Sequence, residues 1–196
     1  FEVRALLAQA QWITPEVFDS LCDSENFLKR FAIPGPTCEG YLFPETYTFA
    51  RGISPESLLG TLLEMHQATV APFLDAAKAQ GLNAREFITL ASIVEKETAA
   101  ATERPHIACV FYNRLRAKPM WQLATDPTVM YAATLVDPAF DGNLTRTHLY
   151  QLQHPYNTYQ IKGLPPGPIA NPGKASFEAV ARPQNCDDFF FVSMNN

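Results

Sequence analysis

The sequence has no surplus of basic residues and no long apolar run. Of its 196 residues, 15 are Lys or Arg and 20 are Asp or Glu, which gives a formal net charge of −5. Because phosphate binding needs an excess of Lys and Arg, this balance argues against a nucleic-acid-binding domain. No apolar stretch approaches the roughly 20 residues that cross a bilayer. The length and the 47% hydrophobic composition predict one globular domain.

Several chemical signatures are also missing. There is no Gly-rich phosphate loop of either common type, so no nucleotide cofactor is expected. The sequence has neither HExxH nor CxxC, and its histidines lack metal-ligand spacing, so no metal site is predicted. The GxSxG turn of serine hydrolases does not occur. What remains for catalysis is carboxylate chemistry.

The cysteines leave the redox state open. They are Cys22, Cys38, Cys109 and Cys186. They fit four separate buried thiols, or disulfides in one of several pairings. The pair to test is Cys22 with Cys38, because the two flank a short segment. A bridge between them would indicate an oxidising compartment.

Hydrophobic periodicity predicts a helix-rich α+β fold with a small β-sheet and long, Pro-rich ordered loops. Helical patterns recur along the chain, including Asn83–Thr98, where Asn83 and Glu86 have the spacing of a capping box. Aromatic residues at Tyr41–Ala50 predict an extended segment. The run Asp188–Val192 predicts a buried strand.

Two acids near the C-terminal end of the Asn83–Thr98 helix are candidates for acid catalysis. On a helical wheel, Glu95 and Glu97 flank opposite edges of the buried apolar stripe. A carboxyl group on such an edge loses hydration and keeps its proton, and the negative end of the helix dipole acts the same way. A general acid needs this property. Helix geometry alone leaves an alternative, in which both acids are solvated and pair with Lys96 or Arg104.

A stiff loop forms the second unusual region. It contains Tyr156–Tyr159 and the Pro-rich stretch Gly163–Ile169. Prolines fix φ, so this loop is stiff although no regular structure is predicted. Aromatic rings beside amide and hydroxyl side chains suit sugars, because rings stack on pyranose C–H faces while amides bond hydroxyl groups. The alternative is an ordered connection that caps the core.

Motifs in a fixed order carry a resemblance to a known family. They are Glu39–Tyr47, Leu90–Glu97, Glu103–Pro105, Val110–Leu115, Thr125–Val129, Tyr156–Tyr159 and Gly163–Ile169. On these motifs the chain resembles the MltG/YceG family of endolytic murein transglycosylases. It departs from the family pattern at Ala124, where the family has Gln, and Gln122 stands two places earlier.

The resemblance implies a lytic transglycosylase that cleaves the MurNAc–GlcNAc β-1,4 bond of peptidoglycan and leaves 1,6-anhydro-MurNAc ends. It implies Glu97 as the catalytic residue, first as general acid and then as base. The residues expected to bind the glycan are Asn113, Arg114, Gln122, Thr125, Asp126, Tyr156, Asn157, Thr158, Tyr159, Pro165 and Pro166. Two alternatives stay open: a binding module that does not cut, and a lysozyme-type hydrolase with Asp126 or Glu103 as second carboxylate.

The resemblance also implies a cellular setting. We expect a catalytic domain over 1–196, with a helical lead-in over about 1–36 and the core over 37–196, trimmed from a longer protein. A transmembrane anchor and a LysM-like module would precede Phe1. The domain would face the periplasmic or extracellular side of the cytoplasmic membrane, where an oxidising environment suits a Cys22–Cys38 bridge. Its expected partners are peptidoglycan strands and cell-wall synthesis proteins.

Overall fold

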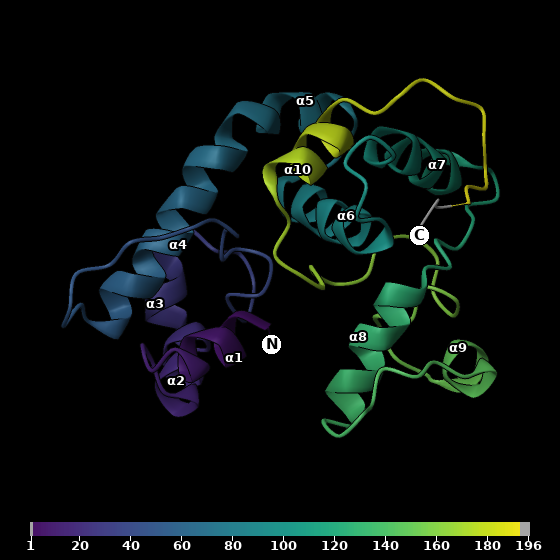
Figure 1. Cartoon of the computed structure of the whole chain (residues 1–196). Helices are drawn as coiled ribbons and strands as arrows, with labels where there is room; N and C mark the ends of the chain where they lie inside the picture. Colours follow the sequence, from purple (N-terminus) through teal and green to yellow (C-terminus); the bar gives the residue numbers. More distant parts are fainter. Residues whose placement is uncertain (1, 193–196) are drawn as a thin grey trace. The chain divides into compact units, whose positions relative to one another are not determined.

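The computed structural model describes residues 2–192. The chain divides into two compact units, Phe1–Pro72 and Phe73–Asn196, which we call the N-terminal and C-terminal units and describe separately. Over residues 2–192, about half of the chain is helical and the rest is turns and irregular segments, with no β-strand (Figure 1). The predicted α+β class with a small β-sheet is therefore wrong, and the described chain is all-α.

Among its described residues, the N-terminal unit has one long helix and three short ones. In chain order they are α1 (Glu2–Gln9), α2 (Pro15–Cys22), α3 (Glu25–Arg30) and α4 (Pro55–Val70). The side chains of Thr14 and Ser54 accept hydrogen bonds from the first turns of α2 and α4. Each cap is followed by a proline, whose fixed φ suits the first helical position.

The predicted extended segment Tyr41–Ala50 is irregular, and no strand pairs with it among the described residues. It contacts α4, where Phe43 N donates to Leu62 O over 3.4 Å. A disulfide joins Cys22, the last residue of α2, to Cys38, with Cα atoms 5.0 Å apart. This is the pair that the sequence singled out.

The C-terminal unit is built around three packed helices. A short 3-10 helix, η1 (Ala71–Phe73), lies at the boundary, and the unit continues with α5 (Leu74–Ala79), α6 (Ala84–Glu97), α7 (Arg104–Arg116), α8 (Asp126–Val136), α9 (Arg146–Gln151) and α10 (Lys174–Ala181). Helices α6, α7 and α10 pack against one another (Figure 1). None of the described helices is both long and apolar enough to span a membrane.

Helix α6 lies at the centre of this packing. Its predicted capping box is confirmed, because Glu86 N donates to Asn83 Oδ1 over 3.0 Å and Asn83 N donates to Glu86 Oε2 over 2.8 Å. Every residue from Phe87 to Val94 is buried, rather than a single stripe, because α7, α8 and α10 all contact the helix. Ile169 N donates to Ser92 Oγ over 3.0 Å, which ties the Pro-rich loop to α6.

The last described segment, Asp188–Val192, is not the predicted buried strand. Its carbonyl groups accept from side chains of α7: Asn113 Nδ2 donates to Asp188 O over 2.9 Å, and Arg114 Nε donates to Phe189 O over 2.8 Å. These side chains take the place that a neighbouring strand would occupy. A run of aromatic residues indicates that a segment packs against the protein, but it does not show which groups form hydrogen bonds with the backbone of that segment.

Candidate active site

Glu97 is the last residue of α6, and its side chain lines a cavity of about 260 Å³, which we call the inner pocket. The helix ends there because Thr98 has an extended conformation, with φ −150° and ψ 141°. The other lining residues come from α7, the start of α8, the loop before α10 and the C-terminal segment. They are Phe111, Arg114, Ala124, Thr125, Asp126, Tyr159 and Phe191.

Burial dominates the electrostatics of Glu97. Loss of hydration raises the pKa of its carboxyl group above the usual range, and the nearby Asp126 acts in the same direction, whereas Thr125 and Arg114 lower the pKa. The buried Thr125 hydroxyl has no well-formed hydrogen bond within residues 2–192, yet it lies close enough to Glu97 to favour the ionised form. Because burial is the largest effect, Glu97 holds its proton to higher pH than a solvated Glu.

Glu95 lies on the other edge of the same helix end, and both of its carboxylate oxygens are engaged. Oε1 accepts from Arg104 Nη2 over 2.9 Å in a largely buried ion pair. Oε2 accepts from Gly173 N over 3.0 Å and from Ser176 Oγ over 2.7 Å. These bonds join α6 to α7 and to the start of α10. Pairing with Arg104, the alternative considered for both acids, is observed for Glu95.

A hydrogen-bond network fixes another wall of the inner pocket. The Tyr159 hydroxyl donates to Asp126 Oδ1 over 2.6 Å. Thr125 N donates to the buried Thr158 Oγ1 over 3.0 Å, and Thr158 Oγ1 also bonds Thr128 Oγ1 at 2.7 Å. Thr125, rather than Asp126, is the N-cap residue of α8. Burial and Asp126 both raise the pKa of Tyr159, so its hydroxyl keeps the proton that it donates.

The turn before α8 brings the predicted residue Gln122 beside the loop. Ala124, where the family pattern has Gln, has φ 48°, a left-handed conformation that is uncommon for a residue other than glycine. Its N–H donates to Thr158 O over 3.1 Å. Gln122 Nε2 donates to Tyr159 O over 2.8 Å. The turn is therefore bonded to the loop on both sides of the residue that departs from the family pattern.

A second cavity of about 490 Å³ adjoins the inner pocket, since Arg114 and Ala124 line both. We call it the outer groove. Its remaining lining residues are Met120, Trp121, Gln122, Lys162 and Phe190. The Arg114 guanidinium donates to the carbonyl oxygens of Leu123 and Phe189, so it joins the two backbone segments that border the groove. Of the predicted site residues, the two cavities thus bring together Glu97, Arg114, Gln122, Thr125, Asp126 and Tyr159.

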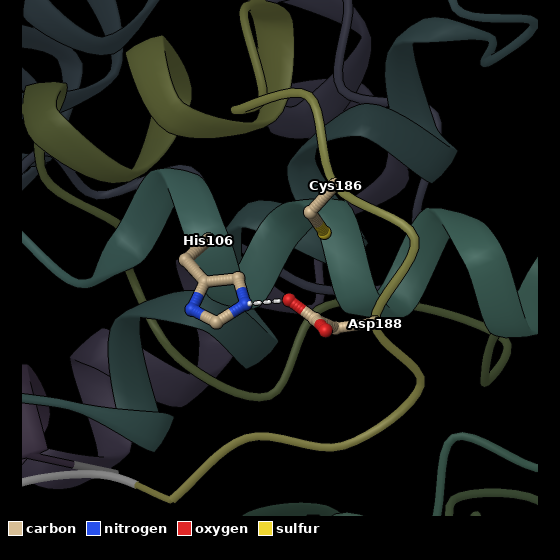
Figure 2. A group of neighbouring side chains, drawn as sticks. All are labelled: His106, Cys186 and Asp188. Atoms are coloured by element: carbon tan, nitrogen blue, oxygen red, sulfur yellow. Dashed lines mark hydrogen bonds and ion pairs between the residues drawn. The ribbon is translucent and has the colours of Figure 1, made fainter.

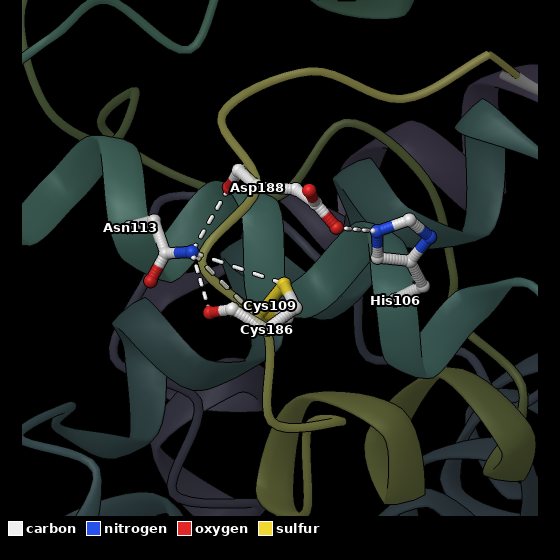
Figure 3. Close-up of polar contacts among 5 residues, drawn as sticks. All are labelled: His106, Cys109, Asn113, Cys186 and Asp188. Carbon is white, nitrogen blue, oxygen red and sulfur yellow. Dashed lines mark hydrogen bonds and ion pairs between the residues drawn. A yellow bond between two sulfur atoms is a disulfide. The ribbon is translucent and has the colours of Figure 1, made fainter.

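The C-terminal segment that lines both cavities is anchored on α7 (Figure 3). A disulfide joins Cys109 of α7 to Cys186, with Cα atoms 6.2 Å apart, so the interpretation of four free thiols is wrong. Asn113 Nδ2 donates to Cys186 O over 3.0 Å and to Asp188 O over 2.9 Å. Asn113, predicted to bind substrate, lines neither cavity and holds this segment in place.

His106, Cys186 and Asp188 are a cluster of possible metal ligands within residues 2–192, with donor atoms within 4.8 Å of one another (Figure 2). The Cys186 sulfur is bonded to Cys109 and is not a thiolate, the form that binds metals. His106 Nε2 lies 2.9 Å from Asp188 Oδ2. The disulfide form therefore offers an imidazole and a carboxylate, fewer protein ligands than a zinc site uses.

Asn157 in the loop points inward. It is fully buried, and its Nδ2 donates to the carbonyl oxygens of His148, Leu149 and Leu152 over 3.2, 3.1 and 2.8 Å. Its Oδ1 accepts from Tyr159 N over 3.0 Å. These bonds close the turn that follows α9, which matches the interpretation of the loop as an ordered connection at this residue.

Unlike Tyr159, the predicted loop residues Tyr156, Thr158, Pro165 and Pro166 also lie outside the lining of both cavities. The Tyr156 ring packs on Tyr131 with centroids 4.9 Å apart. Pro165 is buried, and Pro166 O accepts from Arg85 Nε over 2.9 Å. The Pro-rich stretch is thus bonded to α6 through Pro166 O, while the Pro166 ring is exposed.

Sequence reasoning missed the large apolar residues of the cavities and one lysine. They are Phe111, Met120, Trp121, Lys162, Phe190 and Phe191. One signal was available, because Met120 and Trp121 are large apolar residues in a stretch without helical periodicity. The sequence does not show that this stretch meets the C-terminal segment.

The amino-acid sequence is similar to a known family and to named bacterial proteins. A profile of the YceG-like family matches residues 2–196. A protein of Bacillus subtilis (strain 168) named endolytic murein transglycosylase is 38% identical over 162 residues, which cover 81% of this chain and 42% of that protein. A protein of the same name from Streptococcus pneumoniae serotype 2 (strain D39) is 31% identical over 205 residues, covering 92% of this chain and 35% of that protein. The chain therefore spans less than half the length of these curated relatives.

A solved structure supports the same likeness. The crystal structure of a yceG-like protein from Listeria monocytogenes aligns with a TM-score of 0.81 at 32% sequence identity. The alignment covers 95% of this chain and 64% of that one. The similarity thus extends to the fold of nearly the whole chain.

Proposed function

Because this chain belongs to the YceG-like family, we propose that it is the catalytic part of an endolytic murein transglycosylase, the name that its curated relatives carry. The proposed reaction cleaves the MurNAc–GlcNAc β-1,4 bond within a glycan strand and leaves a 1,6-anhydro-MurNAc end. One observation carries the proposal: Glu97, whose pKa is raised by burial, lines a pocket that shares Arg114 and Ala124 with a larger groove.

In the proposed mechanism, one carboxyl group acts twice. Protonated Glu97 gives its proton to the glycosidic oxygen, the C1–O bond breaks, and positive charge develops at C1 of the muramoyl ring. The Glu97 carboxylate then takes the proton of the C6 hydroxyl as that oxygen attacks C1. Glu97 ends the cycle protonated, and no water is consumed. Burial supports the first step because it raises the pKa of the carboxyl group, so the group holds its proton to higher pH than a solvated Glu.

Neighbouring groups support the second step. Thr125 and Arg114 lower the pKa of Glu97, so they stabilise the carboxylate once the proton has left. The Asp126 carboxylate, held by the Tyr159 hydroxyl, lines the same pocket and would stabilise the positive charge that develops at C1. We propose Glu97 as the catalytic residue and Asp126 as its electrostatic partner.

A second candidate reaction follows from the same pocket. Because Asp126 lines it together with Glu97, a lysozyme-type hydrolase that uses both carboxylates is the alternative. Glu103, the other acid considered, accepts from Thr98 Oγ1 over 2.7 Å and does not line the pocket. The alternative therefore depends on Asp126.

We also propose where the chain acts. Disulfides persist in oxidising compartments, and the two bridges support action on the cell-wall side of the cytoplasmic membrane, periplasmic or extracellular. A membrane anchor, a LysM-like module and cell-wall synthesis partners rest on the family resemblance alone.

Product masses test the proposed reaction. Purified glycan strands are treated with the protein, and the new ends are weighed by mass spectrometry. A transglycosylase gives ends one water lighter than hydrolysed strands. Ordinary reducing ends would overturn the proposal in favour of the hydrolase, and strands that are retained without any new ends would indicate a binding module.

A further inference from the structure

The outer groove contains exposed aromatic rings and a lysine that have no part in the proposed chemistry at Glu97. It adjoins the inner pocket, since Arg114 and Ala124 line both cavities. Its volume of about 490 Å³ exceeds the 260 Å³ of the inner pocket. A polymer cleaved within its length must extend beyond the reacting bond, and the outer groove is the adjoining space.

Exposed aromatic rings in this groove are held in place by one another. The Trp121 side chain is 42% exposed, and its ring centroid lies 4.9 Å from that of Phe189 and 5.9 Å from that of Phe190. Phe190 is 71% exposed, with the Arg114 guanidinium 5.5 Å from its ring centroid. Fixed, solvent-facing rings offer flat apolar surfaces at little conformational cost, which suits the C–H faces of sugars.

The groove also has a positive rim. Lys162 is exposed and lines it, next to Gly163, whose φ of 86° makes the tight turn that brings the loop beside Met120. Gln122 adds an amide group. An uncharged sugar has no need of the Lys162 ammonium group, but a carboxylate-bearing one would pair with it.

We infer that the outer groove binds a saccharide unit of the strand that flanks the unit at Glu97, with a sugar face on Trp121 and a carboxylate of that unit's substituent at Lys162. This inference rests on the proposed function. The carboxylate can belong to the lactyl group of a muramoyl residue or to the peptide attached to it. A peptide is joined to the lactyl carboxyl group by an amide bond, so the lactyl carboxylate is free only where no peptide is attached, and the ligands of the test separate the two sources.

The test measures binding in the Glu97→Gln background, which keeps the ligands intact. Dissociation constants are measured by calorimetry for neutral N-acetylglucosamine oligosaccharides, for peptide-free glycan strands and for peptide-bearing strands. Trp121→Ala should weaken binding of all three by about 2- to 10-fold. Lys162→Gln should weaken only the anionic strands, by about 2- to 5-fold, and less at high salt. The strand type that responds to Lys162→Gln identifies the carboxylate.

Matched controls lie elsewhere in the chain. Trp12 in the N-terminal unit is 39% exposed and packs edge-on against Phe49, as Trp121 does against Phe190, so Trp12→Ala should leave binding unchanged. Lys78→Gln on α5 controls for loss of a positive charge. Phe190→Ala provides a second groove variant at a largely exposed position, in case Trp121→Ala disturbs folding.

The outcomes separate this inference from the proposed function. Unchanged binding in both Trp121→Ala and Phe190→Ala would overturn the groove assignment, while product formation by the wild type would still support the transglycosylase. If Lys162→Gln weakened the binding of neutral and anionic ligands equally, the proposed role of Lys162 would be overturned. Binding that depends on Trp121 without any product from the wild type would overturn the proposed reaction and leave the groove assignment standing.

Discussion

Two acids share the last turn of α6, and their surroundings are opposite. Glu95 faces the packed side of the helix, where Arg104, Gly173 and Ser176 all donate to its carboxylate. Glu97 faces the inner pocket, where burial raises its pKa. The first acid joins three parts of the C-terminal unit, whereas the second lines a cavity and holds its proton to higher pH than a solvated Glu.

The difference shows that the number of hydrogen-bond donors around a carboxyl group, more than its degree of burial, decides whether it serves structure or proton transfer. A carboxylate that accepts several good hydrogen bonds is stable when buried, because those bonds replace its hydration. At Glu97 the stabilisation from Thr125 and Arg114 is smaller than the loss of hydration. Glu95 is therefore suited to hold structure and Glu97 to transfer a proton.

The largest expected effect is on catalysis. Glu97→Gln should lower the rate at which glycan strands are cut by about 10²–10⁴-fold, because an amide cannot donate the proton, while the protein stays folded. The rate is measured from the appearance of new strand ends over time. The matched variant Glu95→Gln should keep most of the activity. The reverse pattern would exchange the roles of the two acids.

The loop at Tyr156–Tyr159 also contains a polar side chain, Asn157, that is hydrogen-bonded within the protein. Asn157→Ala removes hydrogen bonds to three carbonyl groups and should lower the free energy of unfolding by about 2–3 kcal/mol. Urea denaturation measures the loss. Asn143→Ala, at an exposed position, is the control. A variant that binds glycan poorly but unfolds like the wild type would instead place Asn157 at the substrate.

A smaller loss of stability is expected on the packed face of α6. Glu95→Gln keeps the shape of the side chain but removes the charge that pairs with Arg104, so the free energy of unfolding should fall by about 1–2 kcal/mol. Glu178→Gln, on the exposed side of α10, should change it little. Equal stabilities for the two variants would show that the Glu95 bonds contribute nothing net.

The smallest effect concerns the pH dependence of stability. Because folding raises the pKa of Glu97, its contribution to stability is full below the ordinary carboxyl pKa and is lost as pH rises through the raised value. Gln does not ionise, so above neutral pH the Glu97→Gln variant should melt up to about 3 °C higher than the wild type. The difference should shrink in acid. Thermal melts across pH measure it, and a variant that melts lower at high pH would contradict the raised pKa.

The sequence predicted the helices better than their surroundings. Caps and periodicity located α6 to within a residue at each end, since those signals are local. The β-sheet was predicted wrongly because Asp188–Val192 satisfies its carbonyl groups with Asn113 and Arg114, a pairing about 75 residues apart in sequence.

The candidate site was likewise predicted in part. The helical pattern singled out both Glu95 and Glu97 as candidates, but it is their tertiary contacts that distinguish the two acids. Asn157 and Trp121 are errors of opposite kinds. Asn157 was predicted to bind glycan, but its amide donates to backbone carbonyl groups. Trp121 was not predicted as a site residue, but it lines the outer groove.

The measurement that tests the central claim most directly is an NMR titration of the glutamate side-chain carboxyl carbons, with Glu97→Gln to assign the signal. The account predicts that Glu97 titrates with a midpoint above the ordinary Glu value of about 4.3. The activity should fall with rising pH over the same range, because the general acid loses its proton there. A midpoint at or below the ordinary value would contradict the account, since Glu97 would then be ionised before it could act as the acid.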